Sequence, residues 1–310
     1  MTPGMPRVTA IIVTFQSSDT IAAALDALQP AHATGLAEVV VVDNASDDGT
    51  PELVADRYPW VTLVHSGGNL GYGRACNIGF EYATTPYLLV MNPDAVVDVV
   101  ALDRLLEFMD EREEVGMCGP AVVEDSGNLQ PAGAMPGPWK IMLKPLLSGW
   151  AGRGVRKVVP GEPPMRTSWI CGSIMLIRRE LIDEVGGFDP RFFLYFEESD
   201  LCRRAQRAGW QVWTVGEAAC RHVNAASAKR TGAVMMWGTI PEHYFPSRFY
   251  YLVKHHGWPA ALAAEIGELC AMSLRALLER IRGRTYPALG ARLRAPFMKL
   301  PRRPEVVGER

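Results

Sequence analysis

The chain has 310 residues, of which 48% are hydrophobic and 21% are charged, and its formal net charge is −2. This is the composition of a folded globular protein, and the near-neutral charge excludes the strongly basic field typical of nucleic-acid-binding proteins. The six cysteines form no CxxC pair, the N-terminus has no signal-peptide pattern, and no apolar run reaches the roughly 20 residues that span a bilayer. We therefore expect a cytoplasmic protein that binds no nucleic acid and needs no disulfides.

Residues 8–123 alternate between strand and helix patterns. Continuous apolar runs such as 38–43 are typical of parallel strands buried on both faces, and the segments between the runs have helical patterns. The repeated order of strand, helix and strand predicts an α/β fold with a Rossmann-like, mostly parallel sheet flanked by helices. The strands are expected at 8–15, 38–43, 61–64, 87–91 and 117–123, and the helices end at 28, 57, 82 and 112.

The pattern weakens from 124 to 164, where Gly and Pro are frequent. A long irregular segment inside a domain is usually a functional loop or a disordered one, and the sequence leaves both readings open. Regular patterns then return. They predict strands at 169–177 and 211–215 and helices at 179–185 and from 197 to about 208.

Candidate ligand-binding features stand at the ends of four predicted strands. They are Thr14 with Phe15, Asp43, the glycine turn 67–73 and Asp94. Ligands of an open parallel sheet bind beyond the carboxyl ends of its strands, so the convergence predicts a nucleotide-type pocket there. Each feature alone also fits an ordinary turn or helix cap. The glycine turn is not GxGxxG, so a dinucleotide fingerprint is not supported.

Asp94 and His222 are candidate metal ligands. A carboxylate that directly follows a buried strand can hold a hard divalent cation through oxygen, although it can equally cap the next helix. His222 follows a predicted strand end, where a lone histidine is more often structural or exposed. The residues alone leave both alternatives open.

Three acidic residues, Glu197, Glu198 and Asp200, open a helix after an aromatic run at 192–196. Carboxylates suit the positive end of a helix, so favourable placement on the helix dipole is one explanation. A general base is the other, because aromatic shielding raises a carboxyl pKa and prepares the group to deprotonate a hydroxyl.

Taken in order, these segments resemble family-2 glycosyltransferases with the GT-A fold, and most closely their bacterial rhamnosyltransferase-like branch. The resemblance covers about residues 7–225 and preserves the order of the motifs. The segments that carry it are IIVTF, VVDNASDDGT, GGNLGYGRACNIG, LLVMNPD, CGSIMLIRRE, GGFDPRFFLYFEESDLCRRA and RH.

The resemblance implies a nucleotide-sugar site, in which Asp43 accepts an N–H of the base and Arg74 faces phosphate. The segment 92–94 takes the place of the family's DxD metal motif, but only Asp94 keeps a carboxylate. His222 stands where relatives supply a second ligand, so the implied cofactor is a divalent metal, Mg²⁺ or Mn²⁺. The implied nucleotide-sugar-binding residues are Thr14, Phe15, Asp43, Asn69, Gly71, Arg74, Asn92 and Asp94.

The same resemblance implies a catalytic base. Glu197 and Glu198 occupy the family's ED position, whose second carboxylate is the base, so Glu198 takes that role and Glu197 remains a rival. Asp200 would orient the base or hold the acceptor loop, and Trp169 and Gly172 would lie near the acceptor.

The implied function is an inverting, metal-dependent transfer of a sugar to a glycan or lipid-linked acceptor in cell-surface polysaccharide biosynthesis. The resemblance favours dTDP-rhamnose as the nucleotide-diphosphate sugar donor. Two alternatives remain: a non-catalytic nucleotide-sugar-binding protein and a sugar-nucleotide nucleotidyltransferase. The second would need a glycine-rich basic loop after the first strand, where this chain has Gln16-Ser17-Ser18-Asp19. An NAD-dependent oxidoreductase lacks its glycine fingerprint.

The resemblance divides the chain into a GT-A catalytic domain at 1–228 and a C-terminal helical extension with a basic tail at 229–310. The pattern is helical from about 241 to 284, with helical stretches at 247–254 and 260–281, and it admits three interpretations. It is a packing helix, an interfacial helix on anionic lipid at the inner face of the cytoplasmic membrane, or a homodimer contact. Its apolar residues, expected on one face, are Leu262, Ile266, Leu269, Leu274 and Leu278.

Overall fold

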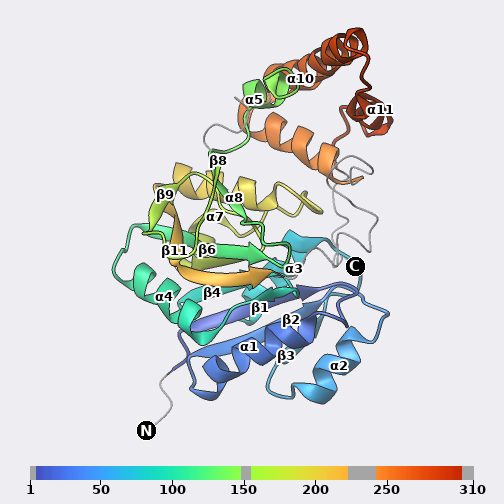
Figure 1. Cartoon of the computed structure of the whole chain (residues 1–310). Coiled ribbons are helices and arrows are strands. Elements are labelled where there is room, and N and C mark those ends of the chain that lie inside the picture. The colour runs from blue at the N-terminus through green and yellow to red at the C-terminus, as the bar shows by residue number, and fades with distance from the viewer. Residues whose placement is uncertain (1–4, 148–154, 223–241, 302–310) are drawn as a thin grey trace. The chain divides into compact units, whose positions relative to one another are not determined.

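The structure is a computed structural model that describes residues 5–147, 155–222 and 242–301 (Figure 1). The chain forms two compact units. The first, called here the sheet unit, comprises 1–134, 155–189 and 198–227; the second, the helical unit, comprises 135–154, 190–197 and 228–310. The predicted boundary at 228 lies among residues 223–241, outside the described residues, and stays a prediction.

The sheet unit is built on a sheet in which nine described strands take part. Its order is β3-β2-β1-β4-β10-β6-β11-β5, with β9 paired to β11. β3, β2, β1, β4, β6 and β11 run parallel, whereas β10, β5 and β9 are antiparallel to their neighbours. The strands are β1 (Val8–Thr14), β2 (Ala37–Asp43), β3 (Thr62–His65), β4 (Tyr87–Met91), β5 (Ala95–Val96), β6 (Val115–Glu124), β9 (Met165–Thr167), β10 (Ile174–Arg178) and β11 (Gln211–His222).

Helices cover both faces of this sheet, which is why β1 and β4 are buried along their whole length. Successive side chains of a strand point to opposite faces. Ala10 and Ile12 therefore join the core formed with α1 and α4, while Ile11 lies under α3. Gly79 of α3 comes so close to Ile11 that an added Cβ would lie 2.4 Å from it. The helices are α1 (Ile21–Ala33), α2 (Thr50–Arg57), α3 (Tyr72–Tyr82), α4 (Val99–Asp110), α7 (Arg179–Val185) and α8 (Glu197–Arg207).

The predicted α/β class with a mostly parallel sheet is confirmed, and some predicted boundaries are wrong. The first helix, expected to end at 28, runs from Ile21 to Ala33. The strand expected at 169–177 begins only at Ile174, and the one expected at 211–215 continues to His222 alongside β6. The irregular segment also contains β7 (Pro131–Gly133) and β8 (Val155–Lys157), which pair antiparallel.

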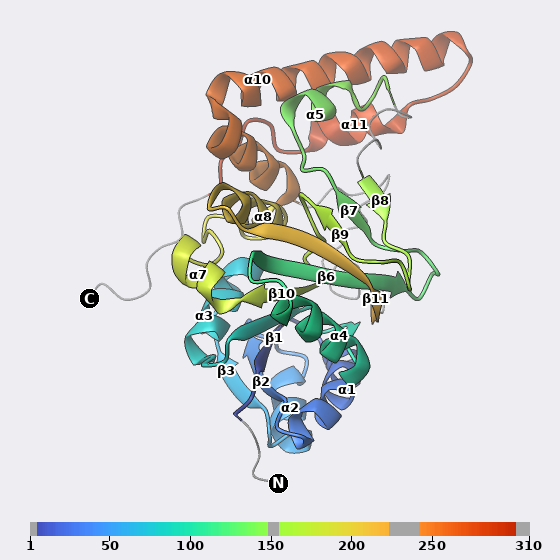
Figure 2. The ribbon, with the colours of Figure 1, turned by 90° about the vertical axis from the view of Figure 1, so that its left-hand side faces the viewer.

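The helical unit consists of α5 (Pro138–Leu143), α10 (Tyr244–Ile281) and α11 (Pro287–Arg294). Gly257, at φ +80°, divides α10 into two arms, and α5 and α11 both contact this helix (Figure 2). Aromatic residues of the first arm pack with Phe192 and Phe196. The kink falls between the two helical stretches expected at 247–254 and 260–281, whereas α11 was not predicted. Within the described ranges, no helix is long and apolar enough to cross a membrane.

Four buried charges fasten the helical unit together. Arg248 Nη1 donates to Glu268 Oε1 at 2.9 Å, and Arg248 Nε donates to Glu265 Oε1 at 3.1 Å. Arg292 of α11 donates to both glutamates as well. Two arginines and two glutamates neutralise one another, so each charge is compensated despite its burial. This four-charge cluster links both arms of α10 to α11.

Candidate active site

The ends of β1 and β2 hold a fixed carboxylate. The parallel register sets Thr14 opposite Asp43, and the Thr14 hydroxyl donates to Asp43 Oδ1 at 2.9 Å. The backbone N–H of Ser46 donates to Oδ2 at 3.0 Å. Asp43 is buried and cannot rotate away without losing both hydrogen bonds. The remaining lone pairs of a carboxylate in this position can accept an N–H from a ligand.

Asn44 ties the glycine turn to the end of β2. Its Nδ2 donates to Asn69 Oδ1 at 3.2 Å and to the Gly71 carbonyl at 3.3 Å, while its Oδ1 accepts the Leu70 N–H at 3.0 Å. The predicted site residues Asn69 and Gly71 are thereby anchored beside β2. Sequence reasoning did not select Asn44, although its position directly after the buried strand was a signal.

The loops that follow β1 and β2 are also bonded to each other. Gln16 N–H donates to Ser46 Oγ at 3.0 Å, and Ser18 N–H donates to Asp48 Oδ2 at 3.0 Å. Burial by itself raises the pKa of Asp48, but hydrogen bonds from Thr50 and Ser18 outweigh it and hold the pKa at about 2. The two loops therefore form one hydrogen-bonded rim.

The start of α3 forms the next part of this edge. Gly71 has φ +85°, a conformation that favours glycine, and the helix begins at Tyr72. The Tyr72 hydroxyl donates to the Gly172 carbonyl at 3.1 Å, so the start of α3 is bonded to the segment before β10. Arg74 in the first turn of α3 and Phe15 after β1 are both partly exposed, so both are accessible to a ligand.

Asp94 and His222 lie in contact, and the backbone explains why. β5 pairs antiparallel with the end of β11, which sets His222 opposite Ala95. His222 Nε2 lies 3.0 Å from Asp94 Oδ1 and 3.2 Å from Asn92 Nδ2, and both Asp94 and His222 are buried. Residues 128 positions apart thus share one polar contact.

This pair fits two ligands of a divalent cation. Ligand atoms bound at about 2.1 Å and at right angles to each other lie about 3 Å apart, which matches the observed Asp94–His222 separation. One carboxylate oxygen and one imidazole nitrogen are a suitable donor set for Mn²⁺. The described residues contain no group of three or more His, Cys, Asp or Glu side chains placed for a metal, so the remaining ligands would be waters or substrate oxygens.

Glu198 is held in place from two sides. The indole N–H of Trp169 donates to Glu198 Oε1 at 3.0 Å, and the Ser199 hydroxyl donates to the same oxygen at 3.0 Å. Gly172 leaves room for the side chain, because an added Cβ would lie 3.3 Å from Glu198 Cβ. Desolvation by burial raises the pKa of Glu198 above its ordinary value, although the Trp169 bond acts in the opposite direction. A carboxyl of this kind is suited to proton transfer.

The other two acidic residues of this helix have different surroundings. Asp200 is fully buried and pairs with Arg204 Nε at 2.7 Å, and Arg204 also donates to the carbonyls of Val185 and Gly187. Asp200 therefore helps to fasten the loop after α7. Glu197 is buried and is grouped with the helical unit.

A backbone link connects the base candidate with the metal candidates. The Asn92 N–H donates to the Ser173 carbonyl at 2.9 Å, and Ser173 adjoins Gly172. The start of β10 lies at the same edge as the end of β4 because these strands run antiparallel. The predicted site residues of the sheet unit consequently lie together at the carboxyl ends of its parallel strands.

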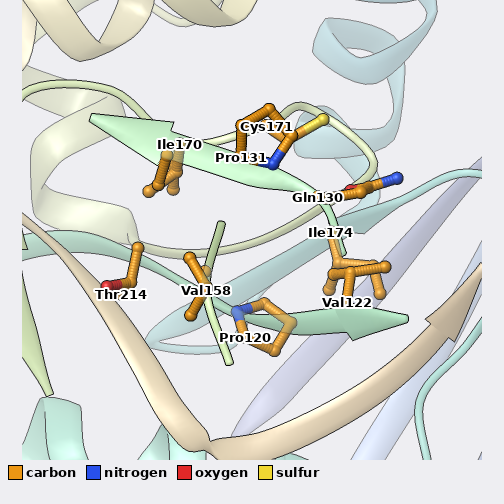
Figure 3. Close-up of a pocket in the computed structure, with 11 residues that line it drawn as sticks. Pro120, Val122, Gln130, Pro131, Val158, Ile170, Cys171, Ile174 and Thr214 are labelled. Atoms are coloured by element: carbon orange, nitrogen blue, oxygen red, sulfur yellow. The ribbon is translucent and has the colours of Figure 1, made fainter. Parts of the chain in front are cut away.

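A small pocket is lined in part by Ile170 and Cys171 of the segment before β10 (Figure 3). Apolar side chains such as Val122, Ile170 and Ile174 form most of its wall, and Cys171, Gln130 and Thr214 are its polar members. None of the predicted site residues is among those that line it. Its largely apolar wall is unsuited to a charged diphosphate.

Comparisons with known proteins agree with this arrangement. Residues 9–186 match the family model described as glycosyl transferase family 2. The chain is 31% identical over 239 residues to the N-acetylglucosaminyl-diphospho-decaprenol L-rhamnosyltransferase of Mycobacterium tuberculosis, an alignment that covers 71% of this chain and 76% of that protein.

Solved structures show the same fold. The mannosyltransferase PcManGT from Pyrobaculum calidifontis in complex with GDP-Man and Mn²⁺ has a TM-score of 0.52 at 19% identity, covering 94% of this chain and 85% of that one. GalNAc-T7 with UDP, GalNAc and Mn²⁺ has a TM-score of 0.55 at 16% identity, covering 71% of this chain and 44% of that longer one. The predicted GT-A fold is thereby confirmed.

Proposed function

The chain belongs to glycosyl transferase family 2 and is a glycosyltransferase, and from this premise we propose how it works. It transfers a sugar from a nucleoside-diphosphate donor to an acceptor hydroxyl, with inversion at the anomeric carbon and with a divalent metal. The reaction serves polysaccharide biosynthesis. The observation that carries the proposal is that a fixed carboxylate base candidate and an Asp–His pair lie at the same sheet edge.

The donor's nucleoside binds at the ends of β1 and β2. Asp43, fixed by Thr14, accepts an N–H of the base, and Phe15 lies beside it. Asn69 and Gly71 border the nucleotide, since Asn44 and the tight turn hold them beside β2. A positively charged group must face the diphosphate, and Arg74 at the start of α3 takes this role. These roles rest on the family resemblance and on the loop geometry.

Asp94 and His222 hold the metal, and Asn92 contributes to the same corner of the site. Their mutual distance supports the assignment, as do the Mn²⁺-containing structures with the same fold. When bound, the ion neutralises charge that develops on the leaving diphosphate. The protein's part is to orient the two ligands, which the pairing of β5 with β11 does.

Glu198 acts as the base. Its carboxylate takes the proton of the acceptor hydroxyl while that oxygen forms the new bond to the anomeric carbon, and the bond from that carbon to the diphosphate breaks. A single displacement of this kind inverts the anomeric centre. Glu198 is preferred to Glu197 because Trp169 and Gly172, beside the proposed acceptor position, contact Glu198. Asp200 holds the neighbouring loop through Arg204.

We assign dTDP-rhamnose as the donor and a lipid-linked diphosphate sugar as the acceptor. The support is the similarity to the mycobacterial rhamnosyltransferase, whose name gives an acceptor of this class. Such an acceptor resides in a membrane, so the enzyme would contact the inner face of that membrane as a peripheral protein. The proposed reaction does not require a homodimer.

The experiment is a donor panel with the purified full chain, Mn²⁺ and a short-chain lipid diphosphate acceptor. Released nucleoside diphosphate is quantified for dTDP-rhamnose, UDP-sugars and GDP-sugars, and NMR gives the anomeric configuration of the product. Acceptor-dependent release from dTDP-rhamnose with an inverted product is expected. Donor binding without any release would identify a binding protein, and a retained configuration would overturn the proposed displacement.

A further inference from the structure

The second arm of α10 carries a row of exposed apolar side chains. The row, called here the α10 stripe, consists of Ile266, Cys270, Leu274, Leu277 and Ile281. Ile266 is 50%, Leu277 56% and Ile281 74% exposed. Steps of three or four residues align these positions along one side of a helix. The predicted face was partly wrong, because Leu262 and Leu269 are half-buried and Leu262 packs in the helical unit's core.

The same arm buries charge on its other side. Glu265 and Glu268 point into the four-charge cluster with Arg248 and Arg292. A helix on the surface of a globular protein ordinarily buries its apolar side and exposes its charges. The second arm departs from this arrangement, because it buries two carboxylates and exposes an apolar row. A continuous exposed apolar row of this kind marks an interaction surface.

Within the part of the helical unit that the structure describes, the stripe is uncovered. α5 and α11 lie along one side of the second arm of α10 (Figure 2). α5 approaches so closely that an added Cβ on Gly267 would lie 2.4 Å from Met142, and Arg275 donates to the Pro145 carbonyl. Ile266, Leu277 and Ile281 nevertheless remain at least half exposed, so these contacts do not cover the stripe.

The chain that leaves the stripe is uniformly basic. Between positions 280 and 304 the sequence has eight arginines and lysines and no acidic residue. Of the basic residues here, the structure describes Arg280, Arg282, Arg284, Arg294 and Lys299 as exposed. Exposed apolar side chains, Leu293 and Phe297, accompany them. Apolar surface beside positive charge is the combination that binds an anionic lipid surface.

We infer that the α10 stripe rests on the surface of a bilayer that contains anionic lipid. The helix lies in the plane of the interface, with the stripe among the acyl chains and the arginines after Ile281 at the headgroups. The inference concerns a surface of the helical unit and not the donor site. It therefore stands or falls separately from the proposed reaction, although it explains how an enzyme could meet a lipid-linked acceptor.

A second copy of the chain is a less suitable occupant. Two copies that pair through this face would bring like charges together, whereas an anionic membrane offers opposite charge. Paired helices ordinarily carry charges of both signs beside their seam, and like charges there repel. Between positions 280 and 304 the charged residues are all basic. Charge complementarity thus favours the anionic membrane.

The test measures binding of the full-length chain to vesicles by co-sedimentation. Vesicles of phosphatidylcholine alone are compared with vesicles that contain about one-third phosphatidylglycerol. The variant Leu277→Glu/Ile281→Glu places charge on exposed positions and leaves the core unchanged. Val100→Glu, an equally exposed apolar position on α4, is the matched control. A third variant, Arg280→Gln/Arg282→Gln/Arg284→Gln, removes the basic flank.

We expect at least about tenfold tighter binding to the anionic vesicles, lost at high salt and in both multiple variants but kept in Val100→Glu. Nucleotide release with a short-chain, water-soluble acceptor should stay unchanged in Leu277→Glu/Ile281→Glu. Equal binding of this variant and the wild type would overturn the inference. So would a wild-type dimer, measured by sedimentation velocity, that dissociates in the variant while neither protein binds vesicles.

Discussion

His222 Nε2 lies 3.0 Å from Asp94 Oδ1, although one residue follows β4 and the other ends β11. The contact exists because β5, directly after Asp94, pairs with the end of β11. Histidine and carboxylate in direct contact form either a structural hydrogen bond or half of a metal site. The two interpretations differ in what removal of the carboxylate does to ligand binding.

Asp94→Ala should weaken Mn²⁺-dependent donor binding by about 10-fold to 100-fold, because one of two protein ligands is lost. Calorimetric titration of dTDP with and without Mn²⁺ measures the effect independently of turnover. Asp103→Ala, an exposed carboxylate on α4, is the control and should bind as the wild type does. Equal dTDP affinities in Asp94→Ala and wild type, each with Mn²⁺, would remove Asp94 as a ligand.

Glu198→Gln should lower kcat by about 10²-fold to 10⁴-fold while the donor affinity stays the same, because the amide cannot accept the acceptor's proton. The amide oxygen can still accept the Trp169 N–H, so the local structure is kept. Glu197→Gln is the matched comparison and should retain most activity. If Glu197→Gln is inactive and Glu198→Gln turns over normally, the two roles are reversed.

Trp169→Phe should shift the pH profile of kcat. The reaction needs Glu198 ionised, so activity falls as the pH drops through its pKa. Burial raises that pKa, and the indole hydrogen bond opposes the rise. Loss of the bond raises the pKa further and moves the acidic limb of the profile to higher pH. Trp139→Phe, an exposed tryptophan on α5, should leave the profile unchanged. A fall in kcat with an unmoved acidic limb would mean that Trp169 does not act through Glu198.

Gly172→Ala should reduce kcat about tenfold with little change in stability, because the new methyl group would push the base from its position. The added Cβ would lie 3.3 Å from Glu198 Cβ, which is tighter than an ordinary contact. Gly137→Ala, where an added Cβ meets nothing within 4 Å, serves as the control. Kinetics and a thermal melt of both variants separate displacement of the base from unfolding.

Asp48→Asn should reduce the free energy of unfolding by about 1 kcal/mol at neutral pH, a figure kept small because Asp48 is partly exposed. The folded pKa of about 2 lies below the ordinary value of 3.8, so the charged form stabilises the fold above pH 3.8. That contribution is lost as the pH falls from 3.8 toward 2. Urea unfolding of both proteins across this range should show the difference shrink. A constant difference would contradict the role of the charge.

The sequence indicates the strand-end residues well and the contacts between them poorly. Thr14, Asp43 and Asp94 were predictable because the carboxyl ends of parallel strands meet at one edge whatever the side chains do. The bond from Trp169 to Glu198 was not, since it joins residues 29 positions apart with β10 and α7 between them. Such a contact depends on how these elements pack, which no periodicity records.

In the helical unit, too, the sequence predicts the elements better than the contacts between them. Helical periodicity placed both arms of α10 and left Gly257 between them, but it did not show that the arms are continuous, because Gly257 followed by Trp258 and Pro259 can either end a helix or bend it. The expected apolar face was partly wrong for a physical reason. The periodic pattern identifies which residues share a side, whereas burial of Glu265 and Glu268 depends on arginines 17 to 27 positions away.

The four-charge cluster has a consequence for any shortened form of the protein. Arg292 stands in α11, outside the helix that holds Glu265 and Glu268, yet it supplies one of the two positive charges that compensate them. Cutting the basic tail upstream of it would leave two buried carboxylates beside a single guanidinium, a deficit that typically costs about 3–5 kcal/mol. Residues of α11 therefore complete the charge balance of α10, and a form that lacks α11 would lose stability across the helical unit.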